Sequence, residues 1–170
     1  MLETQRLTLT HWEEADADAF FRIVRNPRIL PAAGCPAITE EADALRELRE
    51  GYLAEEEYKL VRKADGAVIG SIGLRFGEDA CSGLPMEPEV GFWLDEPFQG
   101  QGYAGEALEA LLGRARAALG CPAVWGCYYE GNARSARLLE RFGFSLVRVN
   151  PCGDTRLGYT MPEAELRLVF

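Results

Sequence analysis

A strand that runs into a glycine-rich turn and then into a helix constrains the fold of this chain more than any other feature. Residues 89–94 are apolar and strand-like, Gly100 and Gly102 follow them, and residues 101–119 carry apolar side chains at helical spacing. The first N–H groups of a helix have no intrahelical partner, and the helix dipole places partial positive charge there. Glycine has no Cβ, so the backbone can approach an anion closely, and Ala104 keeps the adjoining wall small. The segment therefore predicts an anion site that suits a pyrophosphate.

The same turn also has a plainer interpretation. Paired glycines occur in many turns, so Gly100 and Gly102 alone also fit an ordinary loop that leaves the strand. No GK[ST] follows them, so this is not a Walker motif. A dinucleotide-binding fold normally has its glycines after the first strand, whereas several elements precede these.

A second pattern marks the start and the end of a later helix. Asn132 is well suited to cap this helix, and Ser135 lies one turn in on the same face. Gly143 is expected to end the helix, and Phe144 to anchor the strand that follows. Taken alone, these residues could serve only as a helix cap and a helix stop.

The hydrophobic periodicity predicts a mixed α/β order of elements. Strands are expected at residues 6–10, 58–62, 68–74, 89–94, 123–129, 144–149 and 156–161. Helices are expected from Ala17 to before Asn26, after a cap at Thr39 with an apolar side of Ala42, Leu45, Leu48 and Tyr52, and at 101–119 and 132–142. This order suggests one curved sheet covered by helices on both faces. No repeat or linker divides residues 1–170, so a single domain is expected.

Charge and composition exclude several functions. The net charge of −9 argues against direct binding to nucleic acid, which needs a surplus of Lys and Arg. An acidic field favours cationic partners such as amines, although it could equally serve solubility. No long apolar run predicts a membrane helix, and the first residues show no signal sequence, so a cytoplasmic protein is expected. The five cysteines have no CxxC spacing and the only histidine is His11, so no metal and no cysteine nucleophile are expected.

Together, the two patterns resemble the GNAT acetyltransferases. Gln99, Gly102 and Ala104 match the family's pyrophosphate motif, [QR]-x-x-G-x-[GA], and Asn132 and Ser135 match the Asn-x-x-[AS] start of its last helix. Further stretches are similar to the branch that acetylates the N-termini of ribosomal proteins, namely residues 3–7, Trp12, Asp16, 69–74, 89–94 and 102–107. The resemblance covers nearly the whole chain in the right order.

The resemblance implies a mostly antiparallel central sheet, splayed in the middle between strands 89–94 and 123–129, and acetyl-CoA as the acyl donor. The residues that it implies for acetyl-CoA are Phe92, Trp93, Leu94, Gln99, Gly100, Gln101, Gly102, Tyr103, Ala104, Asn132 and Ser135. The strand backbone would polarise the thioester carbonyl, and a neutral amine would attack the thioester directly.

Two proton transfers need side chains. Glu89, at the start of a strand beside the implied cleft, is the first candidate for the base, acting through water, although it could be a solvated strand-end residue. Many GNAT proteins carry a tyrosine where this chain has Leu139, so the usual acid is missing. Ser135 and Tyr128 are candidates in its place. Tyr129 is an alternative to Tyr128, since neighbouring strand residues face opposite ways.

The predicted function is N-acetyl transfer to a primary amine, either a peptide or protein N-terminus or a small molecule such as a polyamine, amino acid or aminoglycoside. The alternative is a non-catalytic acyl-CoA-binding module on the same fold, which Leu139 favours. A ligand-free structural dimer would leave the glycine turn unexplained. The resemblance to the GNAT family also implies a homodimer as one arrangement of the chain. Loop residues Glu78, Asp79 and Glu87 could attract a cationic amine or simply keep their loop solvated.

Overall fold

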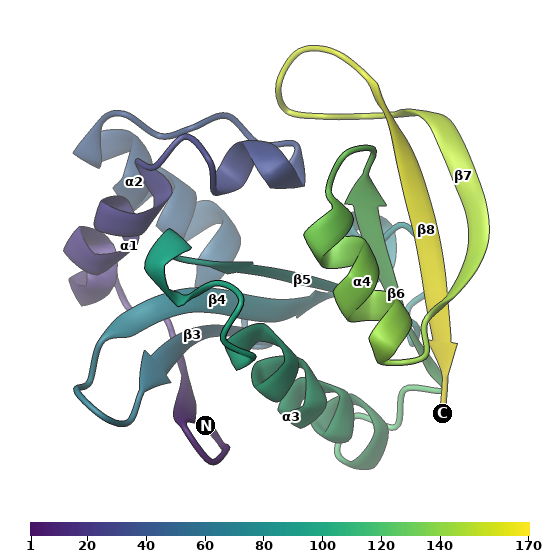
Figure 1. The fold of residues 1–170 in the computed structure, drawn as a ribbon, viewed down its shortest axis with the longest axis horizontal. Helices are drawn as coiled ribbons and strands as arrows, with labels where there is room; N and C mark the ends of the chain where they lie inside the picture. The colour runs from purple at the N-terminus through teal and green to yellow at the C-terminus, as the bar shows by residue number, and fades with distance from the viewer. The chain divides into compact units, whose positions relative to one another are not determined.

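The eight strands of the computed structural model, which describes residues 1–170, form one mostly antiparallel sheet in the order β1-β2-β3-β4-β5-β6-β8-β7 (Figure 1). The strands are β1 (Leu2–Glu3), β2 (Leu7–His11), β3 (Glu57–Arg62), β4 (Val68–Arg75), β5 (Glu89–Leu94), β6 (Ala123–Tyr129), β7 (Ser145–Gly153) and β8 (Met161–Val169). The α-helices are α1 (Ala17–Val24), α2 (Glu41–Glu47), α3 (Tyr103–Ala117) and α4 (Ala133–Arg141). Short helical turns are η1 (Glu14–Asp16), η2 (Leu30–Ala33), η3 (Leu48–Tyr52), η4 (Gly77–Asp79) and η5 (Glu96–Phe98). The mixed α/β class expected from the sequence is confirmed.

The chain divides into two compact units, each built from several separate segments. The first unit comprises Met1–Pro31, Pro36–Gly73 and Phe92–Leu111. The second comprises Ala32–Cys35, Leu74–Gly91 and Leu112–Phe170. Strands β4 and β5 and helix α3 contribute residues to both, so no single linker separates the units. The single domain expected over residues 1–170 stays a prediction.

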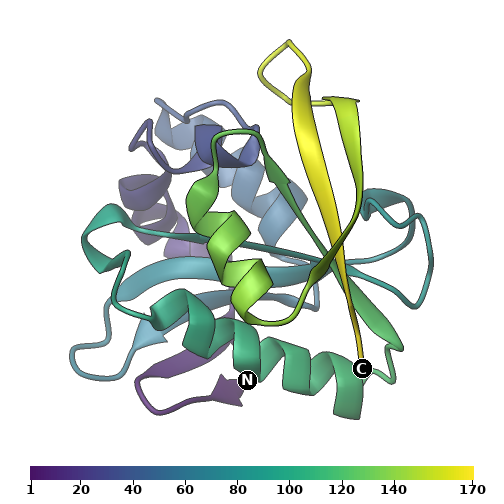
Figure 2. The ribbon, with the colours of Figure 1, turned by 45° about the vertical axis from the view of Figure 1, so that its right-hand side comes forward.

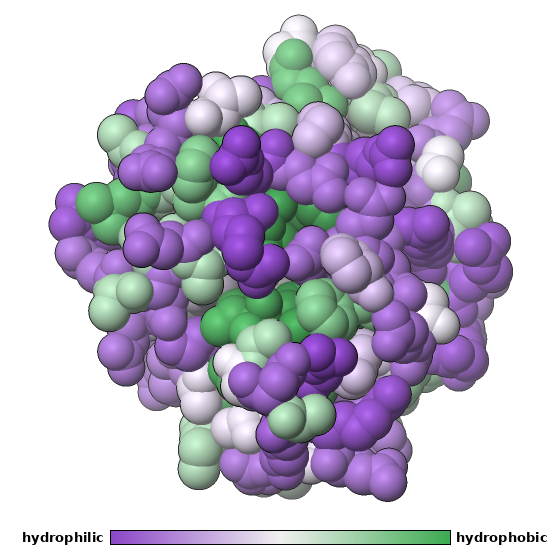
Figure 3. All heavy atoms as spheres, turned by 60° about the vertical axis from the view of Figure 1, so that its left-hand side comes forward, coloured by the Kyte–Doolittle hydropathy of each residue, from purple (hydrophilic) through white to green (hydrophobic).

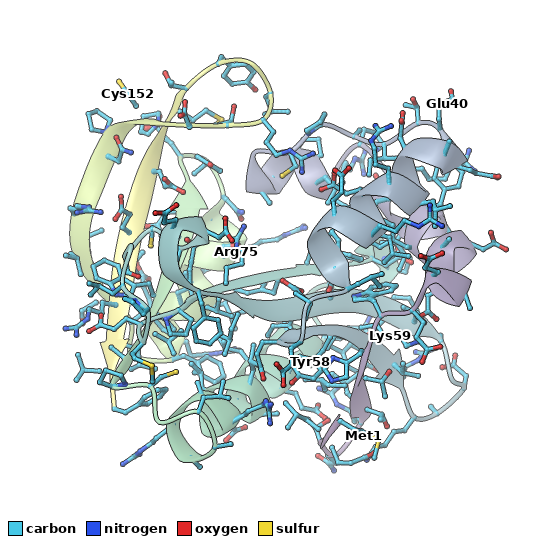
Figure 4. The ribbon with its side chains drawn as sticks, turned by 180° about the vertical axis from the view of Figure 1, so that it is seen from behind. Met1, Glu40, Tyr58, Lys59, Arg75 and Cys152 are labelled. Atoms are coloured by element: carbon cyan, nitrogen blue, oxygen red, sulfur yellow. The ribbon has the colours of Figure 1, made fainter.

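Antiparallel strands form the framework of the first unit. Strand β2 pairs with β3, and β3 pairs with β4, with Tyr58 opposite Ile72. Neighbouring strand residues point to opposite faces, so on β3 Tyr58 is buried whereas Lys59 forms an ion pair with Asp16 (Figure 4). The fully buried residues of this unit include Leu7, Leu9, Phe20, Ile23, Leu48, Leu60, Ile69 and Ile72.

The second unit is built around β6. Strand β6 runs parallel to β5, with Glu89 opposite Trp125, and antiparallel to β8, with Tyr129 opposite Glu163. Helix α4 packs on the face of β6 that carries Gly126 (Figure 2), because a Cβ on that glycine would lie 2.7 Å from the Leu139 side chain. The immediate neighbours of Gly126 on β6, and every second residue from them, therefore point away from α4.

Three expectations about the elements are wrong. The last strand runs from Met161 to Val169 rather than over 156–161, because charged residues alternate with apolar ones along β8 and hide its apolar side. Glu40 rather than Thr39 is the N-cap residue of α2, and it makes no side-chain capping bond. Ala42 is exposed, and Ala44 is buried in its place.

One face of the molecule is mainly polar. Hydrophilic residues predominate on the face drawn in Figure 3, in keeping with the net charge of −9. None of the helices has the length and apolar character that a membrane span requires. A net negative charge attracts cations and repels anions at low ionic strength.

Candidate active site

The glycine-rich turn of the first unit has the backbone that the sequence predicts. Turn η5 leads out of β5, and Gly100 and Gly102 follow with φ angles of +74° and +86°. Side chains disfavour this region, so glycine is the residue that fits both positions. The Gly102 carbonyl accepts the N–H of Glu106 at 3.0 Å, which is the start of the α3 ladder. The backbone N–H groups that precede that of Glu106 have no acceptor within the helix, so they are available to bind an anion.

Side chains hold this turn in place from both ends. Gln99 Nε2 donates to the Leu94 carbonyl oxygen at 2.9 Å, and Gln101 Nε2 donates to that of Pro97 at 2.7 Å. Arg6 Nη1 donates to the Gln101 carbonyl oxygen at 3.0 Å. The sequence pointed to Arg6 only as part of a family-like N-terminal stretch. The structure makes it a positioning residue for the turn.

Glu106 connects the N-terminal segment to α3. Its Oε1 accepts hydrogen bonds from Thr4 Oγ1 and from the Arg6 backbone N–H, both at 2.6 Å, and its Oε2 pairs with Arg6 Nε at 2.7 Å. Burial by itself would raise the pKa of Glu106, but the hydrogen bonds from Thr4 and Arg6 outweigh burial and lower it. The ionised carboxylate is therefore part of the folded structure at neutral pH.

The side chains of the C-terminal half of β5 have structural partners. Trp93 Nε1 donates to Tyr52 Oη at 3.0 Å, and the Trp93 ring lies 6.1 Å from the Trp12 ring and 5.9 Å from the Phe20 ring, between centroids. Leu94 is buried, and Phe92 is half-buried. These contacts hold the strand in the first unit. The predicted pairing of its backbone with pantetheine stays a prediction.

In the second unit, Asn132 caps α4 as the sequence predicts. Its Oδ1 accepts the Ser135 N–H at 3.2 Å. Its Nδ2 donates to the Ala32 carbonyl oxygen at 3.0 Å, so both amide atoms have protein partners. Ser135 is half-buried in the first turn of α4. The roles of Asn132 and Ser135 toward acetyl-CoA stay predictions.

The two candidate tyrosines face opposite sides of the sheet. Tyr128 lies opposite Ala164 on the side that carries Gly126, and Tyr129 lies opposite Glu163 on the other side. Tyr129 Oη donates to the Asp154 carbonyl oxygen at 2.6 Å. Burial, followed by the negative charge of Glu163, raises the pKa of Tyr129 to about 12, so this hydroxyl keeps its proton at neutral pH.

Glu89, the predicted base, is fixed by two donors. Arg75, labelled in Figure 4, approaches Glu89 Oε1 with Nη2 at 2.7 Å. The Cys81 N–H donates to Glu89 Oε2 at 2.9 Å. Each oxygen of the Glu89 carboxylate thus has one protein donor. Whether Glu89 acts as the base stays a prediction.

The loop before β5 uses one of its acidic residues as an anchor. Glu87 accepts hydrogen bonds from Arg167 Nη2 at 2.6 Å and Nε at 2.8 Å, and from Trp125 Nε1 at 2.8 Å. The hydrogen bonds from Arg167 lower the pKa of Glu87 against the opposing effect of burial. Of the three acidic loop residues, Glu87 thus holds the loop to the sheet, and Glu78 and Asp79 are exposed.

Cys81, Glu89 and Cys127 bring two thiols and a carboxylate within 4.8 Å of one another. The sequence did not reveal this grouping, because the cysteines are far apart along the chain. A hydrogen bond with the Cys81 thiol, together with burial, raises the pKa of Cys127. Glu89, the carboxylate of this cluster, is paired with the Arg75 guanidinium, and we assign no metal to the cluster. The predicted absence of a metal stays a prediction.

Glu163 is a carboxylate that the sequence analysis missed. It lies on β8 opposite Tyr129 and is half-buried, and no hydrogen bond or ion pair involves its carboxylate. A Cβ on Gly153 would lie 3.0 Å from Glu163 Oε2, so the missing side chain of Gly153 makes room for the carboxylate. Burial, followed by the negative charges of Glu89 and Glu165, raises the pKa of Glu163 to about 7. The sequence analysis missed this residue because it placed the last strand at residues 156–161, before Glu163.

Leu139 occupies a core position. Its side chain is fully buried and lies against Gly126 on β6. The resemblance described from the sequence implies a tyrosine at this position in many members of the family. In this chain the position packs α4 onto the sheet and offers no proton donor.

A mixed α/β fold with a positive-φ glycine turn at the start of a helix belongs to the class of proteins that can bind a phosphate-bearing ligand at the end of a helix. Residues 6–145 match the acetyltransferase (GNAT) domain family, and the chain belongs to this family. Its members are N-acetyltransferases that use acetyl-CoA as the acyl donor. The family expected from the sequence and the predicted cofactor are confirmed.

Individual relatives agree with this assignment. The chain is 24% identical over 149 residues to the uncharacterized N-acetyltransferase YoaA of Bacillus subtilis, covering 85% of this chain and 82% of the relative. Its fold is similar to that of a GNAT-family acetyltransferase from Bacillus anthracis, with a TM-score of 0.85, 15% identity and coverage of 99% and 97% of the two chains. It is also similar to RimL, a ribosomal L7/L12 α-N-protein acetyltransferase solved with coenzyme A, with a TM-score of 0.74, 17% identity and coverage of 98% and 96%.

Proposed function

We propose that this protein transfers an acetyl group from acetyl-CoA to a primary amine on a peptide or protein N-terminus or on a small molecule. The observation that carries the proposal is the turn at Gly100 and Gly102, whose positive φ angles open α3. The turn is held by Arg6, Gln99 and Gln101, and a framework fixed before the ligand arrives lowers the cost of binding.

The residues proposed to bind acetyl-CoA are those expected from the sequence. The backbone of residues 99–104 would hold the pyrophosphate, and the backbone of residues 92–94 would pair with pantetheine and polarise the thioester carbonyl. Asn132 and Ser135 would contact the thiol end. The side-chain partners of Asn132 and Trp93 leave these roles mainly to backbone groups and to the Ser135 hydroxyl.

An N-terminal α-amine is the acceptor that we favour. RimL, which has a similar fold, is named as a protein α-N-acetyltransferase. The resemblance of the sequence to the ribosomal-protein branch also favours an N-terminal amine. The net charge of −9 favours a cationic acceptor of either kind. A cytoplasmic location and a homodimer remain predictions alongside this choice.

The proposed reaction is a direct attack with no acyl-enzyme. The neutral amine forms a C–N bond to the acetyl carbon, the C–S bond breaks, and the proton lost from nitrogen ends on the CoA sulfur. Ser135 or Tyr128 is proposed to donate a hydrogen bond or proton at that sulfur, since Leu139 cannot. Holding the amine against the carbonyl would supply much of the rate.

The test is CoA-thiol release from acetyl-CoA with a panel of amines. The panel contains short peptides that differ in their N-terminal residue, the same peptides with a blocked N-terminus, polyamines, aminoglycosides and free amino acids. We expect release with free peptide N-termini and none with blocked ones. Binding of acetyl-CoA with no release of CoA thiol in the presence of any amine would contradict the proposed activity. Failure to bind acetyl-CoA would contradict the proposed role of the turn.

A non-catalytic acyl-CoA-binding module is the second candidate, and Leu139 is the observation that favours it. This position is buried in the α4 contact and has no acidic hydrogen to give. Such a module would bind acetyl-CoA and CoA without turning them over. Calorimetric binding of both ligands, measured beside the release assay, separates the two candidates.

A further inference from the structure

Glu163 differs from the other carboxylates on its side of the second unit. Glu89 is paired with Arg75, Glu165 with Arg148, and Glu87 with Arg167. Glu163 is half-buried, and neither a hydrogen bond nor an ion pair occupies its oxygens. A carboxylate in this setting can accept a proton without losing an existing interaction.

Glu163 lies on the same face of the sheet as Glu89, the base predicted from the sequence. Tyr129 lies opposite Glu163 in the β6–β8 pair, and Cys127 lies two residues before Tyr129 on the same face of β6. Cys127 Sγ and a carboxylate oxygen of Glu89 are within 4.8 Å of each other. Glu163 and Glu89 therefore share one face of the sheet, opposite the face that α4 covers.

Resting on the proposed function, we infer that Glu163, rather than Glu89, is the catalytic base that takes the proton from the acceptor ammonium. The acceptor arrives as R–NH₃⁺ and gives one proton to Glu163, which becomes the neutral acid. The free amine forms the C–N bond, the C–S bond breaks, and the second N–H proton ends on the CoA sulfur. Glu163 then returns its proton to solvent.

Glu89 has a supporting role in this scheme. Its ionised carboxylate, fixed by Arg75 and the Cys81 N–H, is a negative charge that raises the proton affinity of Glu163. The charged and titratable groups on this side of the sheet are Arg75, Cys81, Glu87, Glu89, Cys127, Tyr129, Arg148, Glu165 and Arg167. The pKa of Glu163, about 7, is within roughly one unit of a peptide α-amine, which is about 7.7–8.0, so proton transfer between them is nearly balanced.

The pH dependence of kcat/KM for a free-N-terminus peptide tests the inference. In the wild type, kcat/KM should fall as the pH drops below about 7, because Glu163 is then protonated in the free enzyme. Glu163→Gln cannot take the proton and must wait for neutral amine. Its kcat/KM should rise through the pKa of the amine instead, and should be about 10²–10⁴-fold lower near pH 7. Glu163→Asp should restore part of the rate together with the fall at low pH.

Two further variants and one binding measurement complete the design. Glu140→Gln, an exposed glutamate on α4, should keep the wild-type profile. Glu89→Gln should keep a fall at low pH but shift it to lower pH, because it removes the neighbouring charge. Acetyl-CoA affinity measured by calorimetry should match the wild type in Glu163→Gln, which shows that the variant is folded.

The outcomes separate this inference from the proposed function. A wild type that acetylates peptides, with a Glu163→Gln variant that keeps the wild-type rate near pH 7 and the wild-type midpoint of about 7, would overturn the inference alone. A lower rate and a midpoint shifted to the pKa of the amine in Glu89→Gln, but not in Glu163→Gln, would give the base to Glu89. A wild type that binds acetyl-CoA and acetylates nothing would overturn both.

Discussion

Single residues set both the shape of the candidate acetyl-CoA turn and the packing under α4. Gly100 and Gly102 adopt φ angles that side chains disfavour, and Gly102 also faces Arg6, whose Nη2 would lie 3.3 Å from a Cβ there. Gly113, on the exposed side of α3, has neither constraint. Glycine is therefore required just before α3, at Gly102, but not within the helix at Gly113.

Gly102→Ala should weaken acetyl-CoA binding and destabilise the fold. A side chain in the left-handed region costs about 1–2 kcal/mol, and a loss of 1.4 kcal/mol in binding corresponds to a roughly tenfold weaker Kd. Calorimetry with acetyl-CoA and urea unfolding measure the two effects. Gly113→Ala is the matched control, and it should stabilise the protein by about 0.5–1 kcal/mol with unchanged affinity. Wild-type affinity in Gly102→Ala would show that the turn does not bind the cofactor.

Leu139→Ala should destabilise the protein by about 2–5 kcal/mol, because it removes a fully buried side chain that packs on Gly126. Leu139→Met, which nearly conserves volume, should cost less than about 1.5 kcal/mol. Urea unfolding of both variants gives the comparison. Equal, small losses would mean that α4 does not depend on this contact.

At the scale of elements, the sequence predicted the regular parts well and the charged parts poorly. Strands β5 and β6 were predicted with their observed bounds, because their apolar runs end at clear polar or glycine residues. The cap at Asn132 was also predicted correctly. Strand β8 was misplaced, because its Glu163, Glu165 and Arg167 obscure the alternation. The surroundings of Glu163 depend on the pairing of β8 with β6, which lie far apart along the chain. The local pattern of the sequence does not predict such a pairing.

The link between the N-terminal segment and α3 should make stability depend on pH through Glu106. Its pKa is lowered in the folded state, so its contribution is present above the unfolded value of 4.5 and is lost as the pH falls through the folded value. Glu106→Gln should lower the free energy of unfolding at pH 7 by about 1.5–3 kcal/mol, the range for hydrogen bonds to charged groups. The difference from wild type should shrink below pH 4.5. Urea unfolding at both pH values measures it, and a difference independent of pH would contradict the assignment.

At the scale of the whole molecule, the net charge of −9 should act on the acceptor before any contact is made. A cationic peptide is drawn toward an acidic protein, and salt screens this attraction, with a Debye length of about 10 Å at 0.1 M. Raising the ionic strength should therefore lower kcat/KM for a peptide with several lysines and leave kcat nearly unchanged. A peptide of equal length with only its α-amine charged is the control. Equal salt effects on both peptides would rule out steering by the net charge.

The outer strand β7 sets how this molecule can meet others. It is the last strand in the sheet order and carries the exposed residues Leu146, Val147 and Val149. Its pairing with β8 is interrupted between Leu146 and Arg148 and again between Asn150 and Gly153, where Pro151 has no N–H to donate. A strand added from another chain would find a regular ladder for only a few residues before meeting a bulge. The sheet is thus protected against open-ended growth along this edge, and a homodimer built here would have to rely on side-chain contact more than on continuous backbone pairing.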